Sequence, residues 1–293
     1  MLKNNIFLLW YSFCRHVLVI LPDRFFFQLV SFLTHTRLGF KFHPLNFKNP
    51  VTFNDKLNYI KGLPLNDTHT ILADKVLVRQ FIKDRIGENY LVPCLGVYQH
   101  AKDIDFENLP QSFILKTNHG SGWNMICRDK NNFDQKKAIT LFNRWLGFNA
   151  YYLSREKQYK NIRPLIICEE LLKFDIYDYK FFCFHGKPKF VQVDIDRFSN
   201  HKRAFYDMQW NKLPFSIRYP VSAKEILIPA KLEEMKNVAA MLSKDLKFCR
   251  VDLYIHGNKV FFGEVTLIPG GGNEPFLPQE YNKKLGALID ITI

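Results

Sequence analysis

A strand pair near the end of the chain carries charges where a buried hairpin would carry apolar residues. The stretch RVDLYIHGNKVFFGEVT, residues 250–266, alternates in the manner of two antiparallel strands. Three of its charged residues have even numbers: Arg250, Asp252 and Glu264. The odd positions supply an apolar set that is predicted to face a core: Val251, Leu253, Ile255, Phe261 and Val265.

The register of this hairpin decides what the charges do. If the loop around Gly257 has an odd number of residues, Arg250 pairs opposite Glu264 and the even positions share one face. Asp252 then lies within reach of Glu264, with Arg250 between them. Two carboxylates that lie so close repel each other, and a single arginine neutralises only one of the two negative charges. We therefore expect a divalent cation beside Asp252 and Glu264.

The composition predicts a folded protein with a substantial core and excludes a disordered one. Of the 293 residues, 47% are hydrophobic and 15% aromatic, a length that fits one large domain or two modest ones. The net charge of +13 favours anionic partners, although a basic surface also aids solubility. The positive residues are spread out without a recognisable nucleic-acid motif, so no nucleic acid is expected as a partner.

The cysteines and the N-terminus bear on the compartment. Six cysteines lack CxxC or Cys/His spacing, which predicts free core thiols in a reducing compartment and no zinc site. The N-terminus lacks a small-residue cleavage site, so no signal peptide is evident and a cytoplasmic protein is expected. The cysteines are Cys14, Cys94, Cys127, Cys168, Cys183 and Cys249.

Residues 5–33 come closest to a membrane segment. Arg15, His16 and the run Pro22-Asp23-Arg24 interrupt this apolar stretch, so no uninterrupted run of about 20 residues spans a bilayer. The pattern predicts two short helices. They either lie on the inner face of the membrane or pack on the main domain or another subunit.

Periodicity along the rest of the chain predicts an α+β fold. One helix is expected over residues 67–87, ending at Gly87, and a short helix capped by Thr52 or Asn54. Further helices are expected over 134–148 and about 230–245. Strands are expected within 91–98, 112–128, 164–172, 178–196 and 250–266, the fourth of these as a hairpin about Gly186-Lys187-Pro188.

The segment FILKTNHGSGWNM has features of a polyphosphate site. Lys116 ends an apolar strand and is followed by a turn of small polar residues, Thr117–Gly122. A lysine ammonium meets phosphate charge and exposed backbone N–H groups meet phosphate oxygens. The Walker pattern GxxxxGK[ST] is absent, and an ordinary hairpin turn is the alternative interpretation.

Two other lysines call for an anionic neighbour. Lys75 is expected in the first turns of a helix, where the helix dipole gives it no stabilisation, so either a phosphate or plain solvent exposure explains it. Lys180 stands inside an apolar strand, which requires an anion or a partner such as Asp178. Glu169 and Glu170 end a buried strand and mark either a nucleotide-binding hinge or the exit of that strand into solvent.

The segment DIDRFSNHKRAFYD allows two interpretations. Its basic residues are suited to a uronic acid, a phosphate or an amino-acid carboxylate, or form a solvated loop. Its Asp194 and Asp196 form a DxD, which raises the alternative of a glycosyltransferase that uses a nucleotide-sugar. A non-enzymatic binder of acidic glycans is a further alternative.

In their order along the chain, these segments resemble the ATP-grasp superfamily, and more closely its TupA-like group from capsule, teichuronopeptide and O-antigen gene clusters. The resemblance covers roughly residues 20–290. It implies an ATP-grasp fold in which a nucleotide lies between two α+β lobes, residues 67–168 and 169–293, after a helical segment, residues 1–66. The matching segments are LNFKNPVTFNDKL, ADKVLVRQF, FILKTNHGSGWN, CEELL, DYKFFCFHGKPKFVQVDIDRFSNHKRAFYD, RVDLY, FFGEVT and PGGG.

The resemblance also implies roles for individual residues, with ATP and Mg²⁺ as cofactors. Phosphate contacts are implied for Lys75, Lys116 and Lys180, with a flap that includes Ser121 and Gly122. The adenine hinge and ribose contacts are implied for Glu169, Glu170, Leu171, Leu172 and Asp175. Arg250 is implied near the transferred phosphoryl group, and Asp252, Glu264 and Thr266 as metal ligands. Independently of the resemblance, substrate contacts are expected of Arg197, His201, Arg203 and Gly271.

The activity that the resemblance implies is an ADP-forming ligase reaction. A carboxylate is phosphorylated to an acyl phosphate, which an amine then attacks. The expected substrate is an acidic sugar or an amino acid in surface polysaccharide synthesis, with a lipid-linked glycan at the inner membrane as a further partner. Thr266 stands where many ATP-grasp enzymes carry Asn, so the number of metal ions stays open.

Overall fold

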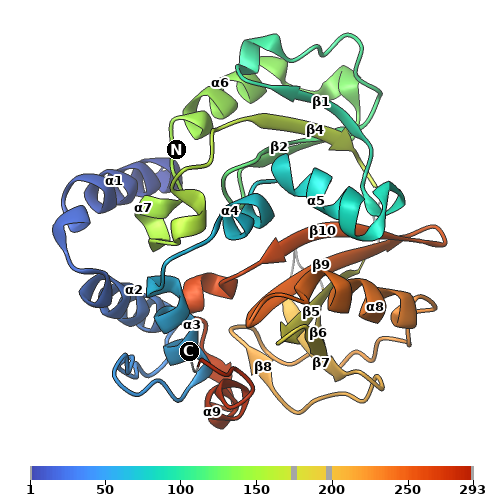
Figure 1. Cartoon of the computed structure of the whole chain (residues 1–293). Helices are drawn as coiled ribbons and strands as arrows, with labels where there is room; N and C mark the ends of the chain where they lie inside the picture. The colour runs from blue at the N-terminus through green and yellow to red at the C-terminus, as the bar shows by residue number, and fades with distance from the viewer. Residues whose placement is uncertain (1, 173–176, 196–199, 292–293) are drawn as a thin grey trace.

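Two antiparallel sheets form the framework of the protein, which we describe from a computed structural model for residues 2–172, 177–195 and 200–291 (Figure 1). The four-stranded sheet has the order β1 (Cys94–Tyr98), β4 (Ile166–Glu170), β2 (Phe113–Thr117), β3 (Asn124–Cys127). The five-stranded sheet has the order β10 (Lys259–Thr266), β9 (Phe248–His256), β5 (Asp178–Phe184), β6 (Lys187–Ile195), β7 (Lys202–Asp207). A small ladder pairs β8 (Ser216–Ile217) with β11 (Phe276–Leu277).

Helices pack against both sheets and form the N-terminal end of the chain. The N-terminal helices are α1 (Leu2–His16), α2 (Asp23–Arg37) and α3 (Phe53–Gly62), followed by α4 (Asp67–Ala73) and α5 (Leu77–Ile86), which lie between the two sheets in Figure 1. The others are α6 (Gln135–Leu146), α7 (Tyr151–Ser154), α8 (Leu232–Ser243) and α9 (Glu280–Gly286). In Figure 1 the two sheets lie one above the other, with β10 between β9 and the upper lobe.

In the part of the chain that the structure describes, most buried apolar side chains belong to three clusters. The smaller sheet packs with α6 through Phe142 and Ala138. The larger cluster joins the five-stranded sheet to α8 and also takes in Leu72 and Val78 of α4 and α5. A third cluster holds α1 and α2 against Leu45. The α+β class and the N-terminal helical segment are confirmed, whereas the division at residues 66 and 168 stays a prediction.

The expected single helix over residues 67–87 is wrong, because the chain breaks between α4 and α5. Asp74 accepts hydrogen bonds from the backbone N–H groups of Val76 (2.8 Å) and Leu77 (3.2 Å), which starts a new helix there. Lys75 therefore lies in the connection between two helices. The predicted stop is confirmed, since Gly87 follows α5 with φ 103°.

The capping and cysteine predictions hold in large part. Thr52 begins α3 with a capping box in which Asp55 is the reciprocal partner, which decides between Thr52 and Asn54. All six cysteines are free thiols, and five are buried as expected, but Cys94 is exposed. Within the described ranges no helix is both long enough and apolar enough to cross a bilayer.

The register of the β9–β10 hairpin differs from the prediction. His256 pairs with Lys259, so the turn has two residues, and Leu253 pairs with Phe262 instead of Phe261. The ladder then shifts between Phe262 and Glu264, which leaves Gly263 as a β-bulge. Beyond this bulge Glu264 faces Asp252 and Thr266 faces Arg250. The bulge thus achieves what the odd loop was expected to achieve, with Asp252 as the direct partner of Glu264.

Replacement of Gly263 by alanine is expected to destabilise this hairpin. A Cβ at this position would lie 2.6 Å from the Tyr254 ring and 3.0 Å from the Asp252 carbonyl oxygen, so the strands must shift. We expect a loss of about 1–3 kcal/mol in the free energy of unfolding, measured by urea denaturation. Gly62→Ala, where the added Cβ meets no atom within 4 Å, is the control. Equal stability of the two variants would contradict the assigned bulge.

Candidate functional site

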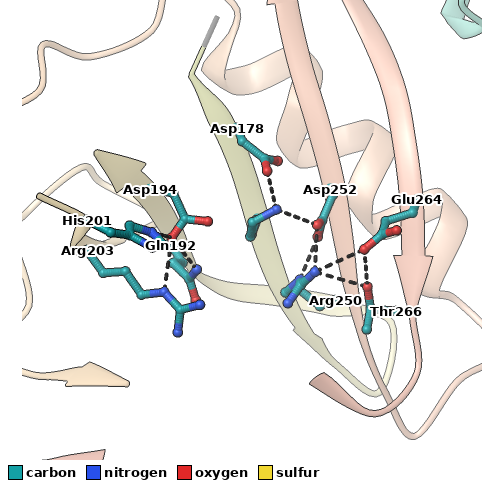
Figure 2. A network of polar contacts seen from close by, with 10 residues as sticks. Asp178, Gln192, Asp194, His201, Arg203, Arg250, Asp252, Glu264 and Thr266 are labelled. Atoms are coloured by element: carbon teal, nitrogen blue, oxygen red, sulfur yellow. Dashed lines mark hydrogen bonds and ion pairs between the residues drawn. The ribbon is translucent and has the colours of Figure 1, made fainter. Parts of the chain in front are cut away.

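A band of charged and polar side chains crosses one face of the five-stranded sheet (Figure 2). Directly paired residues of antiparallel strands share a face, and the pairs here are Thr266 with Arg250, Glu264 with Asp252, Asp252 with Lys180, Lys180 with Gln192, and Asp194 with Arg203. All five strands therefore contribute. The sheet brings together residues that lie up to 86 positions apart, from Lys180 to Thr266.

Arg250 is the centre of one half of this band. Its Nε donates to Asp252 Oδ1 (2.6 Å), and its Nη2 donates to Asp252 Oδ2 (2.7 Å), Glu264 Oε1 (3.2 Å) and Thr266 Oγ1 (3.1 Å). Thr266 Oγ1 in turn donates to Glu264 Oε1 (2.9 Å). The predicted group of Arg250, Asp252, Glu264 and Thr266 is thus assembled in space.

Lys180 reaches the same carboxylate from the neighbouring strand. Its Nζ donates to Asp252 Oδ2 (2.7 Å) and also contacts Asp178. Burial would lower the pKa of Lys180, but the charges of Asp252 and Asp178 outweigh burial and raise it. The prediction that Lys180 needs an anion or Asp178 is confirmed, since it has both acids.

Glu264 is the acid of this group that solvent reaches. Its side chain is 42% exposed, whereas that of Asp252 is 1% exposed. Burial would raise the pKa of Glu264, but the charges of Arg250, Lys75 and Lys180 outweigh it and lower the pKa to about 2. Glu264 is therefore an ionised oxygen donor at neutral pH, open to a ligand on one side.

The four-stranded sheet contributes a second set of charges. Lys116 Nζ donates to Glu169 Oε2 (2.8 Å), and Arg79 Nη1 donates to Glu169 Oε1 (2.7 Å). Lys75 Nζ donates to the Gly120 carbonyl oxygen (2.6 Å) in the turn between β2 and β3. Burial is the main cause that lowers the pKa of Lys75, and the charge of Glu264 opposes it, so Lys75 lies between the two sheets.

The turn after β2 is fastened at its base and exposed at its tip. Asn118 accepts a hydrogen bond from the Leu165 backbone N–H (2.7 Å) and its own carbonyl accepts from the Lys75 N–H (3.2 Å). Ser121 and Gly122 at the tip are exposed, and Gly122 has φ 78°. The tip therefore has the exposed backbone that a phosphate-covering flap requires.

The predicted hinge is described in part. Glu169 forms ion pairs with Lys116 and Arg79, which the sequence did not predict. Glu170 is exposed, and Leu171 and Leu172 are half-buried. Asp175 lies outside the described residues. The adenine and ribose contacts of this segment stay predictions.

A second charged group, on β6 and β7, occupies the DxD position. Asp194 Oδ1 accepts hydrogen bonds from Gln192 Nε2 (2.9 Å) and Arg203 Nε (3.0 Å) and lies 3.1 Å from His201 Nε2. Burial would raise the pKa of Asp194, but Arg203 and Lys180 outweigh it and lower the pKa to about 2. Asp196, the other acid of the DxD, lies outside the described residues. Because Asp194 already neutralises Arg203, the geometry adds no support for the glycosyltransferase alternative.

The substrate residues proposed from sequence are only partly brought together. Arg203 Nη1 donates to Glu274 Oε1 (3.4 Å), and Arg218 Nη1 lies 3.7 Å from the same oxygen. The sequence analysis missed Arg218 and Glu274, which no local pattern links to Arg203. Arg197 lies outside the described residues. Gly271 lies in a turn, η6 (Pro269–Gly272), that follows β10.

The donor set suits Mg²⁺ but is small. Mg²⁺ binds through one or two carboxylates together with waters and substrate phosphates. Asp252 and Glu264 face each other, and the Thr266 hydroxyl lies beside them. Among the described residues, no three His, Cys, Asp or Glu side chains form a metal-binding group. The residues fit an ion that takes its remaining ligands from a bound phosphate.

A family profile described as TupA-like ATPgrasp matches residues 55–290, which is most of the chain. The chain belongs to this family. The expected resemblance is confirmed, and the ATP-grasp fold follows from it. A comparison with curated proteins finds no match.

Solved structures of ATP-grasp enzymes are distant from this TupA-like protein. D-alanine–D-alanine ligase from Helicobacter pylori is 17% identical with a TM-score of 0.40 and covers 69% of this chain and 56% of its own. N5-carboxyaminoimidazole synthetase from Staphylococcus aureus is 15% identical with a TM-score of 0.41 and covers 67% and 44%. The TupA-like chain thus spans about half the length of these enzymes.

The ion pairs of Asp194 are expected to make the free energy of unfolding depend on pH in the acidic range. Because folding lowers the pKa of Asp194 from 3.8 to about 2, its stabilisation is complete above pH 4 and is lost as the pH falls towards 2. Over that range the wild-type protein should lose about 2 kcal/mol more than Asp194→Asn, measured by urea unfolding. Glu280→Gln, at an exposed acid, should retain the wild-type slope. Parallel curves for wild type and Asp194→Asn would contradict the assigned pairing.

Proposed function

We propose that this protein is an ATP- and Mg²⁺-dependent ligase that joins a carboxylate to an amine. The observation that carries the proposal is the carboxylate pair Asp252 and Glu264, surrounded by Arg250 and Lys180 on one sheet and approached by Lys75 from the other side. Membership of the TupA-like ATP-grasp family supports the choice of ATP. Lysines, an arginine and a metal ion are the groups that stabilise a transferred phosphoryl group.

Binding of the nucleotide is proposed to exchange ion-pair partners. Without a ligand, Lys116 is neutralised by Glu169, and Lys180 and Arg250 by Asp252. The phosphates then offer these cations new anionic partners. Asp252 and Glu264, with the Thr266 hydroxyl, would hold Mg²⁺, which supplies charge neutralisation between the phosphates and the two acids.

The proposed reaction has two steps. A substrate carboxylate oxygen attacks the γ-phosphorus of ATP and the bond to the β–γ bridging oxygen breaks, which releases ADP. The amine then attacks the acyl carbon, loses a proton and displaces phosphate. Arg250 and Lys180 orient and neutralise the γ-phosphoryl group, and the turn with Ser121 and Gly122 excludes water from the acyl phosphate.

The proposed substrate is an acidic sugar or an amino acid. The family resemblance supports an acidic sugar or an amino acid in capsule, teichuronopeptide or O-antigen synthesis, with a lipid-linked glycan as the carrier. Arg203 and His201 lie on β7 and beside it, at the far side of the same sheet face. Arg218, which lies near Glu274 and is 35% exposed, is a further candidate contact for an acidic substrate.

Thermal stability with and without Mg·ATP tests the nucleotide site. A ligand that binds only the folded protein at 100 times its Kd adds about 2.7 kcal/mol, a rise in Tm of roughly 5 °C or more. We expect this rise with Mg·ATP and its loss in Asp252→Asn and in Glu264→Gln. Asp245→Asn, at an acid that is 68% exposed, should keep it. An unchanged rise in both site variants, or a rise with nucleotide-sugars alone, would contradict the proposal.

Lys116 is expected to bind phosphate once it leaves Glu169. Lys116→Met removes a charge-assisted hydrogen bond, so the affinity for ATP should fall about tenfold or more in titration calorimetry. Lys137→Met, at an exposed lysine of α6, is the matched control and should bind as the wild type does. Equal affinities for all three proteins would show that Lys116 does not contact the nucleotide.

A further inference from the structure

The outer face of the N-terminal helices is unusually apolar. Of the large hydrophobic side chains that are exposed in the described residues, about half lie between residues 6 and 33. Along α1 they recur every three or four residues, which places them on one side of the helix. This outer face consists of Ile6 (62% exposed), Leu9 (72%), Phe13 (43%), Val17 (49%), Val19 (46%), Ile20 (82%), Phe25 (67%), Phe32 (46%) and Leu33 (38%).

The opposite face of the same helices is already packed. Tyr11 and Cys14 of α1 and Phe26 and Phe27 of α2 are buried. Arg155 donates to the carbonyl oxygens of Leu18 (2.5 Å) and Leu21 (2.6 Å), which fixes the connection between the two helices. A helix that is apolar on both sides needs a second apolar environment. The rest of the chain therefore buries the inner face of these helices, whereas their outer face is exposed.

The segment that carries the outer face is rich in basic residues. Between residues 6 and 50 the chain has five Lys or Arg residues and one acid, Asp23. Arg155 Nη1 pairs with Asp23 at 2.8 Å, so this acid is already neutralised. The five basic residues are all exposed: Arg15, Arg24, Arg37, Lys41 and Lys48. An apolar face with a cationic margin is complementary to an anionic lipid surface, where each Lys or Arg adds about 1 kcal/mol of attraction.

We propose that the hairpin of α1 and α2 docks on an anionic phospholipid bilayer, with its outer face in the boundary between headgroups and acyl chains. Each helix has 15 residues and is about 22 Å long, too short for the hydrocarbon core of about 30 Å. Pro22 separates them. The hairpin therefore lies in the plane of the membrane surface.

Docking would also place the candidate substrate turn near the membrane. The Phe27 ring, on the inner face of α2, lies 4.1 Å from Lys61 Nζ. Lys61 Nζ donates to the Gly271 carbonyl oxygen (2.7 Å) in η6. Two contacts thus connect the docked helix to the turn that follows the metal-site strand. This arrangement suits an acceptor that is itself held in the membrane.

Vesicle flotation of the 293-residue chain tests the proposal. We expect binding to phosphatidylcholine vesicles that contain about one third phosphatidylglycerol, and binding at least about tenfold weaker to phosphatidylcholine alone or at about 1 M salt. Leu9→Glu/Ile20→Glu should reduce binding to the anionic vesicles about tenfold or more. Leu227→Glu/Ile228→Glu changes two residues that are 89% and 64% exposed elsewhere, and should bind within about twofold of wild type.

A folding control and a second variant complete the vesicle experiment. The Tm without added nucleotide should be the same in both double variants as in the wild type, which shows that they fold and separates this test from that of the ligase proposal. Arg15→Glu/Arg24→Glu is a second variant for the cationic margin and should also weaken binding. No binding to anionic vesicles, or equal binding of wild type and Leu9→Glu/Ile20→Glu, would overturn the proposal. A lipid-free dimer that Leu9→Glu/Ile20→Glu dissociates would overturn it in favour of a second copy of the chain.

Discussion

The arrangement of the large sheet depends on the pairing of Asp252 with Arg250 and Lys180. The Asp252 side chain is 1% exposed and receives hydrogen bonds from both cations. Loss of one partner from a buried ion pair leaves an uncompensated charge and typically destabilises a protein by about 3–5 kcal/mol. Lys180 connects β5 to Asp252 on β9, and Arg250 on β9 donates to Glu264 and Thr266 on β10, so the contacts join these three strands. The same contacts bring Glu264 and Thr266 beside Asp252, so structural stability and the candidate metal site rest on the same atoms.

The acids and cations of the candidate site balance one another's charge. Glu169 neutralises Lys116, Asp252 neutralises Lys180 and Arg250, and Asp194 neutralises Arg203. Apart from Lys75, which donates to the Gly120 carbonyl oxygen, these cations are thus paired with acids before a phosphate or a substrate binds. A phosphate that binds here must compete with those acids. A divalent ion beside Asp252 and Glu264 would offset their charge, which is a further reason to propose Mg²⁺ at this site.

Sequence periodicity predicted most elements of this fold but not their exact register. It identified the β9–β10 hairpin and its charged residues, yet two-residue alternation contains no information about a bulge, and Gly263 within a strand was the signal that could have revealed it. Helical spacing likewise continued through Asp74, where α4 ends and whose side chain accepts hydrogen bonds from the backbone N–H groups of Val76 and Leu77. The pairing of Glu169 with Arg79 spans 90 residues, and only the folded chain brings those side chains together. The resemblance in motif order favoured one candidate site where spacing alone left alternatives, and the roles of its residues stay predictions.

Helix α1 also contacts aromatic residues that lead to the turn between β2 and β3. Tyr11 of α1 packs against Phe148 with ring centroids 4.6 Å apart, and Phe148 packs against Trp123 at 5.8 Å. Trp123 belongs to the turn between β2 and β3, whose tip carries Ser121 and Gly122. A chain of three aromatic rings therefore connects α1 to the base of this turn. If the turn closes over a nucleotide, these three rings have to repack. Binding of α1 and α2 to a membrane and binding of a nucleotide would then affect each other.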